Sequence, residues 1–361
     1  MRRPQSSLLR TTSNNPPTNF SDMIPTKEQI EEIACIEQRT PDWFRARLGC
    51  ITGSNAHFVM KLSDAEKAVQ KAIAAGKIEM ETKVQFNSRM SALKKTDPAA
   101  YRNAVERGRI VESDKSFNER IERLKTAANA SPFPDTTIAY LYQVAAERNL
   151  RDVFVKDDDF FEQYLRRTSF TSAAMQWGTD TEAMARLQYQ RETGREVVEV
   201  GFHRHPSVDW FGDSPDGIVV DSESGKPLGG VEIKCPKPET WVRYRHEFRK
   251  GMRQHDKFVQ EYKEQHTEIG ADTFTDEMLP TEQRMDAINL ATLKRIKPEY
   301  YWQCQSHCAC CDLDWCDFVF YDQMQKGEMC VIRIYRNEDD ITAMLQRIEL
   351  ANKFIDNEIL A

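Results

Sequence analysis

Two short apolar segments joined by a turn constrain the fold more than any other part of the chain. The first, at 217–220, follows Ser-Pro-Asp, and the second reads Val-Glu-Ile-Lys-Cys-Pro at 231–236. The residues between them are rich in Asp, Ser, Gly and Pro, which favour turns. We therefore predict two antiparallel strands, and this pairing would bring Asp216 towards Glu232.

The charged residues of this pair suggest metal-assisted hydrolysis of a phosphodiester. Glu232 and Lys234 alternate with apolar residues, so both charges share one face of the strand. Together with Asp216 they provide two carboxylates of the hard-oxygen kind that Mg²⁺ takes, and an ammonium that would position the attacking water. The same pattern also occurs by chance, and Glu232 and Lys234 would then form a surface salt bridge of little consequence.

Four sequence blocks, in order, resemble motifs of a known family. They are R-A-R-L-G-C-I-T-G-S at 45–54, W-G-T-D-T-E-A at 177–183, the segment at 214–236, and Y-Y-W-Q-C-Q at 300–305. The family is the lambda-exonuclease-like, or YqaJ-type, branch of the PD-(D/E)xK nucleases. The resemblance implies an α/β (α+β) fold with a restriction-endonuclease-like core, in which helices flank a central mixed β-sheet and helical insertions are added.

The resemblance also implies a role for each candidate site residue. The catalytic residues would be Asp216, Glu232, Lys234, Glu182 and Gln303. The metal ligands would be Asp216, Glu232, the carbonyl of Ile233 and Glu182, with Mg²⁺ as the cofactor and Mn²⁺ able to replace it. The 5′-phosphate of a DNA end would be held by Arg47 and Ser54, with further substrate contacts from Ser214 and Arg45.

The residues alone leave a plainer interpretation of Glu182 open. The pattern from 178 to 193 is helical, with Gly194 as its C-cap. Glu182 would then be a favourable acid in the first turn, at the border of an apolar face formed by Ala183, Met184 and Leu187.

The other two blocks also have structural alternatives. The small and hydroxyl residues at 49–54, next to Arg45 and Arg47, suit the capture of a phosphate by N–H groups, hydroxyls and a guanidinium. They are equally typical of a capping turn with solvated arginines. Gln303 would support the catalytic lysine or the water if the family motif holds, and would otherwise be an ordinary solvent-facing glutamine.

Charge excludes one class of function and leaves another. The chain has 361 residues and a formal net charge of −7, which argues against a protein that coats DNA. A helix at 241–257 would nevertheless have an apolar stripe of Trp241, Tyr244, Phe248 and Met252. Cations flank that stripe: Arg243, Arg245, His246, Arg249, Lys250, Arg253 and Lys257. They favour contacts to a nucleic-acid backbone over a merely solvated face.

Nine cysteines in a chain without a secretory signal predict reduced thiols. Several cluster with one histidine: Cys304, His307, Cys308, Cys310, Cys311 and Cys316. The spacing argues against an iron–sulfur cluster or Zn²⁺ at Cys304, Cys308 and Cys311, because ligands along one helix face cannot readily surround a metal. Core packing is the favoured interpretation of these cysteines.

The predicted organisation is a disordered tail at 1–22 and a single nuclease domain at 23–361. Helical insertions are expected at about 61–170 and about 255–297, late strands at 318–321 and 330–335, and a terminal amphipathic helix at 341–355. No apolar run approaches the length of a membrane helix. We expect a cytoplasmic protein, in the host cell if it is viral, and organelle targeting by the tail is the weaker alternative.

The sequence thus predicts a Mg²⁺-dependent exonuclease that degrades duplex DNA from an end, 5′ to 3′. The resemblance implies a role in phage-type recombination, with a single-strand annealing protein as partner and a ring-like homo-oligomer as one assembly. One alternative is an endonuclease, or a repair or helicase-associated nuclease, of the same superfamily. A second is a non-catalytic DNA-binding recombination protein.

Overall fold

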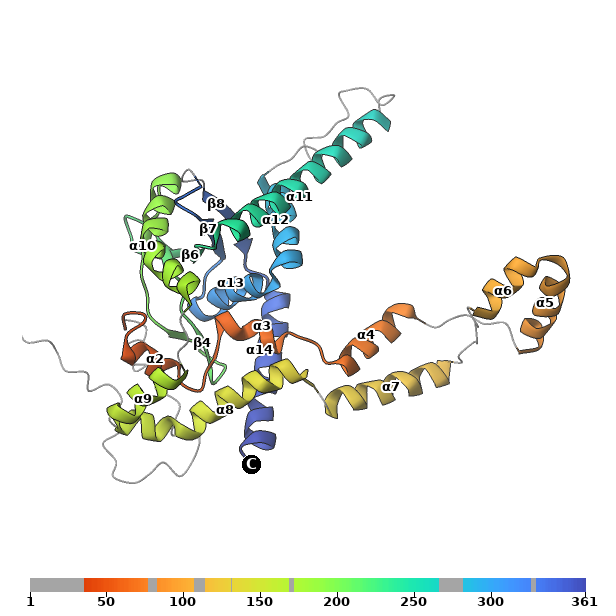
Figure 1. Ribbon diagram of the computed structural model, residues 1–361, viewed down its shortest axis with the longest axis horizontal. Helices are drawn as coiled ribbons and strands as arrows, with labels where there is room; N and C mark the ends of the chain where they lie inside the picture. Colours follow the sequence, from red (N-terminus) through yellow and green to blue (C-terminus); the bar gives the residue numbers. More distant parts are fainter. Residues whose placement is uncertain are drawn as a thin grey trace, which may run out of the picture. The chain divides into compact units, whose positions relative to one another are not determined.

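The computed structural model describes residues 36–76, 83–106, 114–130, 132–168, 172–265, 282–325 and 329–361. The chain divides into two compact units, one of Lys61–Ala139 and one of Met1–Met60 together with Tyr140–Ala361 (Figure 1). The tail predicted at 1–22 lies outside the described residues. The predicted division into a tail and a single nuclease domain with two insertions remains a prediction.

The smaller unit is helical. Its helices are α4 (Asp64–Ala75), α5 (Lys83–Thr96), α6 (Pro98–Glu106) and α7 (Asp114–Ala130). Helix α4 begins with a capping box, in which the Ser63 hydroxyl accepts from the Glu66 N–H and the Glu66 carboxylate accepts from the Ser63 N–H. Two further helices, α8 (Asp135–Lys156) and α9 (Asp158–Thr168), complete the predicted stretch. From Tyr140 onward this stretch belongs to the larger unit.

A five-stranded mixed sheet in the order β2-β5-β6-β7-β8 forms the centre of the larger unit. Its strands are β2 (Glu196–Val198), β5 (Gly217–Val220), β6 (Pro227–Lys234), β7 (Trp315–Tyr321) and β8 (Met329–Tyr335). Strands β5 and β6 are antiparallel, with Gly217 opposite Val231, so the predicted strand pair is confirmed. Strand β7 is parallel to β6 and antiparallel to β8.

A second, three-stranded sheet brings the N-terminal segment to the same region. Its order is β1-β4-β3, with β1 (Ile51–Thr52) parallel to β4 (Phe211–Asp213) and β3 (His203–Arg204) antiparallel to β4. Helix α2 (Pro41–Arg47) precedes β1, and η2 (Gly53–Asn55) and α3 (Ala56–Val59) follow it. Because β4 leads into Asp216, this pairing sets the segment at 45–54 beside the predicted catalytic strands.

Helix α10 (Ala173–Thr193) packs on one face of the main sheet through Ala185 and Tyr189, which join Val231 and Ile233 in one core cluster. Gly194 is its left-handed C-cap, as predicted.

Two expectations about this helix are wrong. It begins nine residues before Glu182, after the Ser172 N-cap, so Glu182 lies mid-helix and not in the first turn. Met184 and Leu187 are 48% and 54% exposed, and the buried face instead contains Glu182 and Arg186. Those two side chains form an ion pair at 2.8 Å, which offsets the desolvation that burial of either one alone would require.

The long connection from β6 to β7 supplies helices for the other face. These are α11 (Pro238–Gln265), α12 (Glu282–Ile296) and α13 (Pro298–Cys311). The rings of Trp241, Tyr244 and Phe248 pack against Phe320 of β7, so the predicted apolar stripe of α11 is confirmed. The chain ends in α14 (Glu338–Phe354) and η5 (Ile355–Ile359). The buried side of this last segment contains Ile341, Met344, Ile348, Ala351 and Ile355, as predicted.

The predicted fold class is confirmed. Helix α10, the antiparallel strands β2, β5 and β6, a helical crossover and the parallel strand β7 form a mixed sheet flanked by helices. Within the described ranges, none of the helices is both long and apolar enough to span a membrane.

Candidate active site

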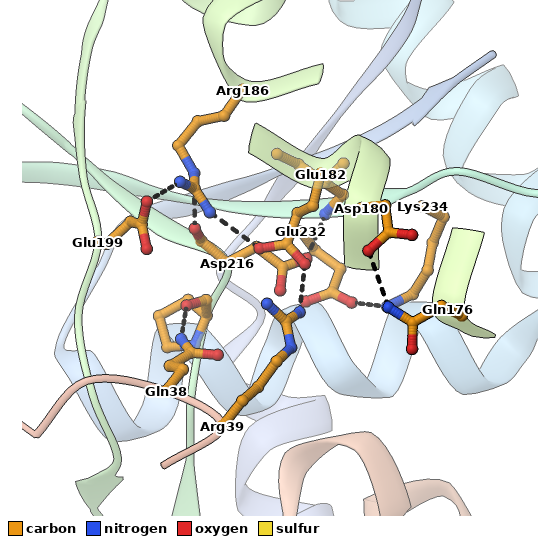
Figure 2. Close-up of polar contacts among 12 residues, drawn as sticks. Gln38, Arg39, Gln176, Asp180, Glu182, Arg186, Glu199, Asp216, Glu232 and Lys234 are labelled. Carbon is orange, nitrogen blue, oxygen red and sulfur yellow. Dashed lines mark hydrogen bonds and ion pairs between the residues drawn. The ribbon is translucent and has the colours of Figure 1, made fainter. Parts of the chain in front are cut away.

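The predicted strand pair brings the central candidates together. Asp216 immediately precedes β5, and Glu232 and Lys234 lie on β6. The Ile233 N–H donates a hydrogen bond of 2.7 Å to Asp216 Oδ2, which fixes this carboxylate against the neighbouring strand. Lys234 Nζ forms a short ion pair with Glu232 Oε1 (Figure 2 shows these side chains). Glu232 is fully buried, so its interaction with Lys234 is not the surface salt bridge considered as an alternative.

Glu182 reaches the same place from α10. Figure 2 shows its carboxylate close to those of Asp216 and Glu232, with Arg186 and Arg39 reaching it from opposite sides. Arg186 Nη2 donates to Glu182 Oε1 at 2.8 Å, and Arg39 Nη2 forms a short ion pair with Oε2. Arg186 also donates to the Asp216 carbonyl at 3.1 Å, which ties α10 to the loop before β5.

Arg39 is held in place by its backbone. Its φ is +65°, a left-handed conformation that few residues other than glycine adopt. The preceding side chain holds this turn, because Gln38 Nε2 donates to the carbonyls of Val200 at 2.8 Å and Pro215 at 2.9 Å. The loop therefore positions a guanidinium, 44% exposed, over the acidic cluster.

Electrostatics distinguish the three carboxyl groups. Burial raises the pKa of Asp216 well above its ordinary value, and the negative charges of Glu232 and Glu182 add to the effect. Burial also opposes ionisation of Glu232, but Lys234 and His307 outweigh it, and the pKa of Glu232 lies below its usual range. Burial would lower the pKa of Lys234, yet Glu232 and Asp216 hold it above normal, so Lys234 is an ammonium.

Three carboxylates and a strand carbonyl are hard oxygen donors, which is the ligand chemistry of Mg²⁺ or Mn²⁺. Within the described residues, no three His, Cys, Asp or Glu side chains are arranged to enclose a metal ion. The observed partners explain this, because Arg39 binds Glu182 and Lys234 binds Glu232. The oxygen donors fit a divalent metal ion once Arg39 releases Glu182 and Lys234 releases Glu232. The raised pKa of Asp216 indicates that the cluster would accept further positive charge.

A buried histidine that sequence reasoning did not assign to the site holds the other oxygen of Glu232. His307 lies on α13, is fully buried, and its Nε2 is 2.7 Å from Glu232 Oε2. Its Nδ1 is 2.7 Å from Asp213 Oδ2, an ion-pair contact that is not aligned as a hydrogen bond. Burial would lower the pKa of His307, but the two carboxylates raise it well above its ordinary value. His307 is therefore a buried imidazolium between two carboxylates.

Asp213 connects this histidine to the N-terminal segment. Its Oδ1 accepts from the Ser214 N–H at 2.8 Å, and its carboxylate lies against Gly53, where an added Cβ would be only 1.9 Å from Oδ2. A side chain at position 53 is therefore incompatible with Asp213 in its observed place. A continuous set of contacts runs from Gly53 through Asp213 and His307 to Glu232.

Gln303 lies one helical turn before His307, on the same face of α13. It is buried, and none of the hydrogen bonds among the described residues involves its amide, so it is not a solvent-facing glutamine. Gln305, in contrast, has a structural role, donating to the Tyr335 carbonyl at 2.9 Å and accepting from the Asn337 N–H at 3.0 Å. Only Gln303 of the two has amide groups available to a water or a substrate.

The residues predicted to hold a DNA end are brought together in part. Arg47 lines a cavity of ≈500 Å³, together with Thr52 and others. Its guanidinium stacks on Trp43 with 3.9 Å to the ring centroid, and within the described part of the chain it forms no ion pair. Burial lowers the pKa of Arg47. Trp43 Nε1 donates to Ser214 Oγ at 3.0 Å, so one tryptophan positions two of the candidates.

Ser54 and Arg45 have different environments. Ser54 Oγ is exposed and 3.2 Å from Thr52 Oγ1, at the edge of this region. Arg45 does not join Arg47, because its guanidinium pairs with Asp158 at 2.7 Å and donates to the Phe154 carbonyl at 3.1 Å. Arg45 thus connects α2 to helices α8 and α9, and the structure does not support it as a substrate contact.

The cysteines of α13 lie in the protein core. Cys304, Cys308 and Cys316 are fully buried, Cys310 is 8% exposed, and Cys311 is partly exposed. Burial raises the pKa of Cys308 and Cys310. Their environment is the one expected for core packing, and His307 of the same cluster faces carboxylates.

Four residues with clear places in the site were missed by sequence reasoning. They are Arg39, Arg186, Asp213 and His307. Two signals existed in the chain: Asp213 directly precedes the Ser-Pro-Asp motif, and His307 is four residues after Gln303. Neither signal indicates that the two residues meet, because β4 and α13 are about a hundred residues apart.

None of the curated proteins matches this chain. The solved structures that are similar to this chain include two of the alkaline exonuclease LHK-Exo from Laribacter hongkongensis. The first has a TM-score of 0.44. The second, in complex with dAMP, has a TM-score of 0.45. Each has 23% sequence identity over 89% of this chain and 95% of the other.

A family profile gives a further match, to the YqaJ-like viral recombinase domain over residues 144–314. This range includes the blocks at 177–183, 214–236 and 300–305, whereas the block at 45–54 lies outside it. The resemblance to YqaJ-type proteins that the sequence predicts is therefore confirmed for residues 144–314, the part of the chain that contains Glu182, Asp216, Glu232, Lys234 and Gln303.

Proposed function

We propose that the protein is a metal-dependent DNA exonuclease that hydrolyses duplex DNA from an end. The observation that carries the proposal is the convergence of Glu182, Asp216 and Glu232 beside the ammonium of Lys234. The match to the YqaJ-like viral recombinase domain supports it, because the match spans all four residues.

Mg²⁺ is the proposed cofactor, with Mn²⁺ able to replace it. Its ligands would be Asp216, Glu182, the Ile233 carbonyl and Oε1 of Glu232, because His307 holds Oε2 of that side chain. When bound, the ion would supply Lewis-acid activation of the phosphate and of a water molecule. Lys234 would give up its ion pair with Glu232 and orient the attacking water.

Substrate contacts would come from the cations around the cluster. Arg39 is partly exposed and pairs only with Glu182 among the described residues, so it is available to a phosphate oxygen once the metal takes that carboxylate. Gln303 would hold the water or Lys234 in place. Arg47, stacked on Trp43, and Ser54 would receive the terminal 5′-phosphate, and this would set the 5′ to 3′ direction.

Degradation of defined DNA tests the enzyme proposal. Linear duplex and covalently closed circular duplex are incubated with Mg²⁺, and released nucleotides are measured. We expect degradation of the linear DNA only. Lys234→Ala should lower the rate by about 10²–10⁴-fold. The matched control is Lys226→Ala, which removes an exposed lysine from the β5–β6 turn of the same strand pair and should keep the wild-type rate.

Each outcome discriminates between the functions considered. Cutting of the circle would favour an endonuclease of the same superfamily. No release of nucleotides from any end structure by the wild-type protein would refute the enzyme proposal and leave a non-catalytic DNA-binding protein.

A second comparison tests recognition of the end. With 5′-phosphate and 5′-hydroxyl duplexes, the wild-type enzyme should prefer the phosphate, and Arg47→Gln should remove most of that preference. Equal rates on both ends for the wild-type protein would exclude the role assigned to Arg47 and Ser54. A function in phage-type recombination, an annealing partner, a ring-like oligomer and a cytoplasmic location remain predictions of the sequence resemblance.

A further inference from the structure

The exposed face of α11 has a dense and regular set of cations. It contains Arg243, His246, Arg249, Lys250, Arg253 and Lys257, which we call the α11 basic stripe. All six side chains are exposed. At 3.6 residues per turn they fall within an arc of about 120°. They extend over about 21 Å of helix, at 1.5 Å per residue.

The stripe is a consequence of how the helix is buried. Trp241, Tyr244 and Phe248 pack on Phe320 of the main sheet, so the opposite side of α11 must face solvent. Of the acidic residues at 238–257, Glu247 and Asp256 lie outside the arc, and Glu239, in the first turn, lies within it. Glu247 pairs with Arg295 of α12 at 2.7 Å, which removes it from the balance of the exposed face. The helix thus has an apolar side that faces the sheet, a flank where Glu247 is paired with Arg295, and a basic side that faces solvent.

Four of the six stripe cations are not engaged in ion pairs or side-chain hydrogen bonds of the described part of the chain. Within the described residues, Arg243, Arg249, Lys250 and Arg253 make no ion pair and no hydrogen bond to another side chain. A solvated face that only serves solubility usually has charges of both signs at helical spacing. Here the residues from 238 to 257 contain six Lys or Arg against three Asp or Glu, while the whole chain has a formal net charge of −7. Positive charge is therefore concentrated on this one helix face.

The position of the stripe in the larger unit indicates its partner. Helix α11 begins four residues after Lys234, and its Tyr244 lies near Tyr300, whose ring has Lys234 Nζ 5.5 Å from its centroid. Figure 1 shows α11 leaving the sheet with α12 beside it. The two helices are in close contact at Gly251 of α11, where an added Cβ would be 2.8 Å from Thr292 Oγ1 of α12. Helix α12 therefore packs against the side of α11 that lies away from the stripe.

We propose that the α11 basic stripe is a DNA-binding surface that contacts the phosphate backbone of the duplex held at the catalytic cluster. DNA has about one phosphate per 3.4 Å of axis along each strand, so the length of the stripe matches about six phosphates. Contacts of this kind read no sequence, which suits an enzyme that degrades any duplex. The inference depends on the proposed function only for the choice of DNA as the polyanion.

The test is the salt dependence of DNA binding by the full-length chain. The probe is a linear duplex with 5′-phosphate ends, and EDTA is present so that binding is measured without cleavage. The stripe variant is Arg243→Gln, Lys250→Gln and Arg253→Gln combined. The control variant makes the same change in charge at three exposed cations elsewhere in the larger unit: Arg167→Gln, Arg191→Gln and Lys226→Gln.

The slope of log Kobs against log salt should fall by about 2.7 in the stripe variant, from about 0.9 for each lost phosphate contact. The ratio of wild-type to variant affinity should therefore shrink about 40-fold as salt rises from about 50 to about 200 mM. The control should keep the wild-type slope. Equal slopes for wild type and stripe variant would refute the inference and leave α11 free for a protein partner. An equal reduction of the slope in the control variant would also refute the inference, because it would mean that only the total charge of the chain matters.

The result of this binding test can be distinguished from the result of the degradation test of the enzyme proposal. A wild-type chain that binds DNA through the stripe but releases no nucleotides would retain the surface and refute the nuclease. A chain that degrades linear DNA while the stripe variant binds like wild type would retain the nuclease and refute the surface.

Discussion

Replacement of His307 by glutamine is the sharpest test of the buried network. His307 is fully buried between Asp213 and Glu232, with both separations at 2.7 Å. In the folded chain its positive charge offsets one of the two carboxylates, and Lys234 offsets the other. His307→Gln keeps a similar volume and a hydrogen-bond donor but leaves one buried negative charge without a partner. Removal of one member of a buried ion pair destabilises a protein by about 3–5 kcal/mol, and we expect a loss of that size.

The double variant Asp213→Asn and His307→Gln separates charge from packing. It removes one negative and one positive charge together, so Glu232 and Lys234 again balance. We expect the free energy of unfolding to recover, with a coupling energy of about 2–3 kcal/mol between the two positions. The measurement is urea unfolding in EDTA, which removes any contribution from bound metal.

His203→Gln is the matched control. His203 is half-buried on β3, directly opposite Asp213 in the sheet register, and its Nε2 lacks a hydrogen-bond partner among the described residues. Burial lowers the pKa of His203, so it is a neutral imidazole beside the same carboxylate. Its replacement should change the free energy of unfolding by less than about 1 kcal/mol.

The effect of His307 should also depend on pH with a definite sign. The two carboxylates raise its pKa in the folded chain well above 6.5, so the stabilisation is complete below the ordinary pKa. It is lost progressively as the pH rises through the folded pKa. The stability difference between wild type and His307→Gln should therefore be largest near about pH 6 and smaller near about pH 9. A difference that is constant with pH, or single-variant losses that simply add in the double variant, would refute the buried imidazolium.

Three further outcomes test other parts of the structure. Asp317→Asn should lower the free energy of unfolding, measured in urea, by about 3–5 kcal/mol. The reason is that this fully buried carboxylate accepts hydrogen bonds from Arg333, Tyr189 and Arg195. A loss below about 1 kcal/mol would contradict the importance of this network. Gly53→Ala should reduce end degradation and thermal stability together, since the new Cβ would meet Asp213 Oδ2 at 1.9 Å. The control for thermal stability is Gly178→Ala, where an added Cβ meets no atom within 4 Å. Cys308 should react with iodoacetamide only after unfolding, because burial raises its pKa; rapid alkylation of the folded chain at about pH 8 would show that this part of the core opens.

The local part of the site could be predicted because it depends on short-range rules. The turn-rich residues between the two strands fix an antiparallel pair, and the period of two along β6 sets Glu232 and Lys234 on one face. The apolar stripe of α11 and that of the terminal helix follow from helical periodicity in the same way.

The prediction failed on α10, where periodicity misled. Met184 and Leu187 have the spacing of a buried face, but the helix instead buries Glu182 and Arg186. The buried pair Glu182 and Arg186 is stabilised by groups far away in sequence. Arg39 pairs with Glu182, and the Asp216 carbonyl accepts from Arg186. The hydrophobicity pattern of one helix contains no information about such partners. The ion pair of Arg45 with Asp158 of α9 likewise joins distant segments that no local pattern relates.

Local sequence patterns were enough to predict the β5–β6 pair, with Asp216 facing Glu232 and Lys234, because strand register and turn chemistry act over a few residues. What surrounds that pair depends on long-range packing. The parallel pairing of β1 with β4 sets Gly53 against Asp213, and the crossover from β6 to β7 sets His307 of α13 against Glu232. These contacts join segments separated by tens to hundreds of residues. They arise from burial of two sheets under shared helices, which no local pattern encodes.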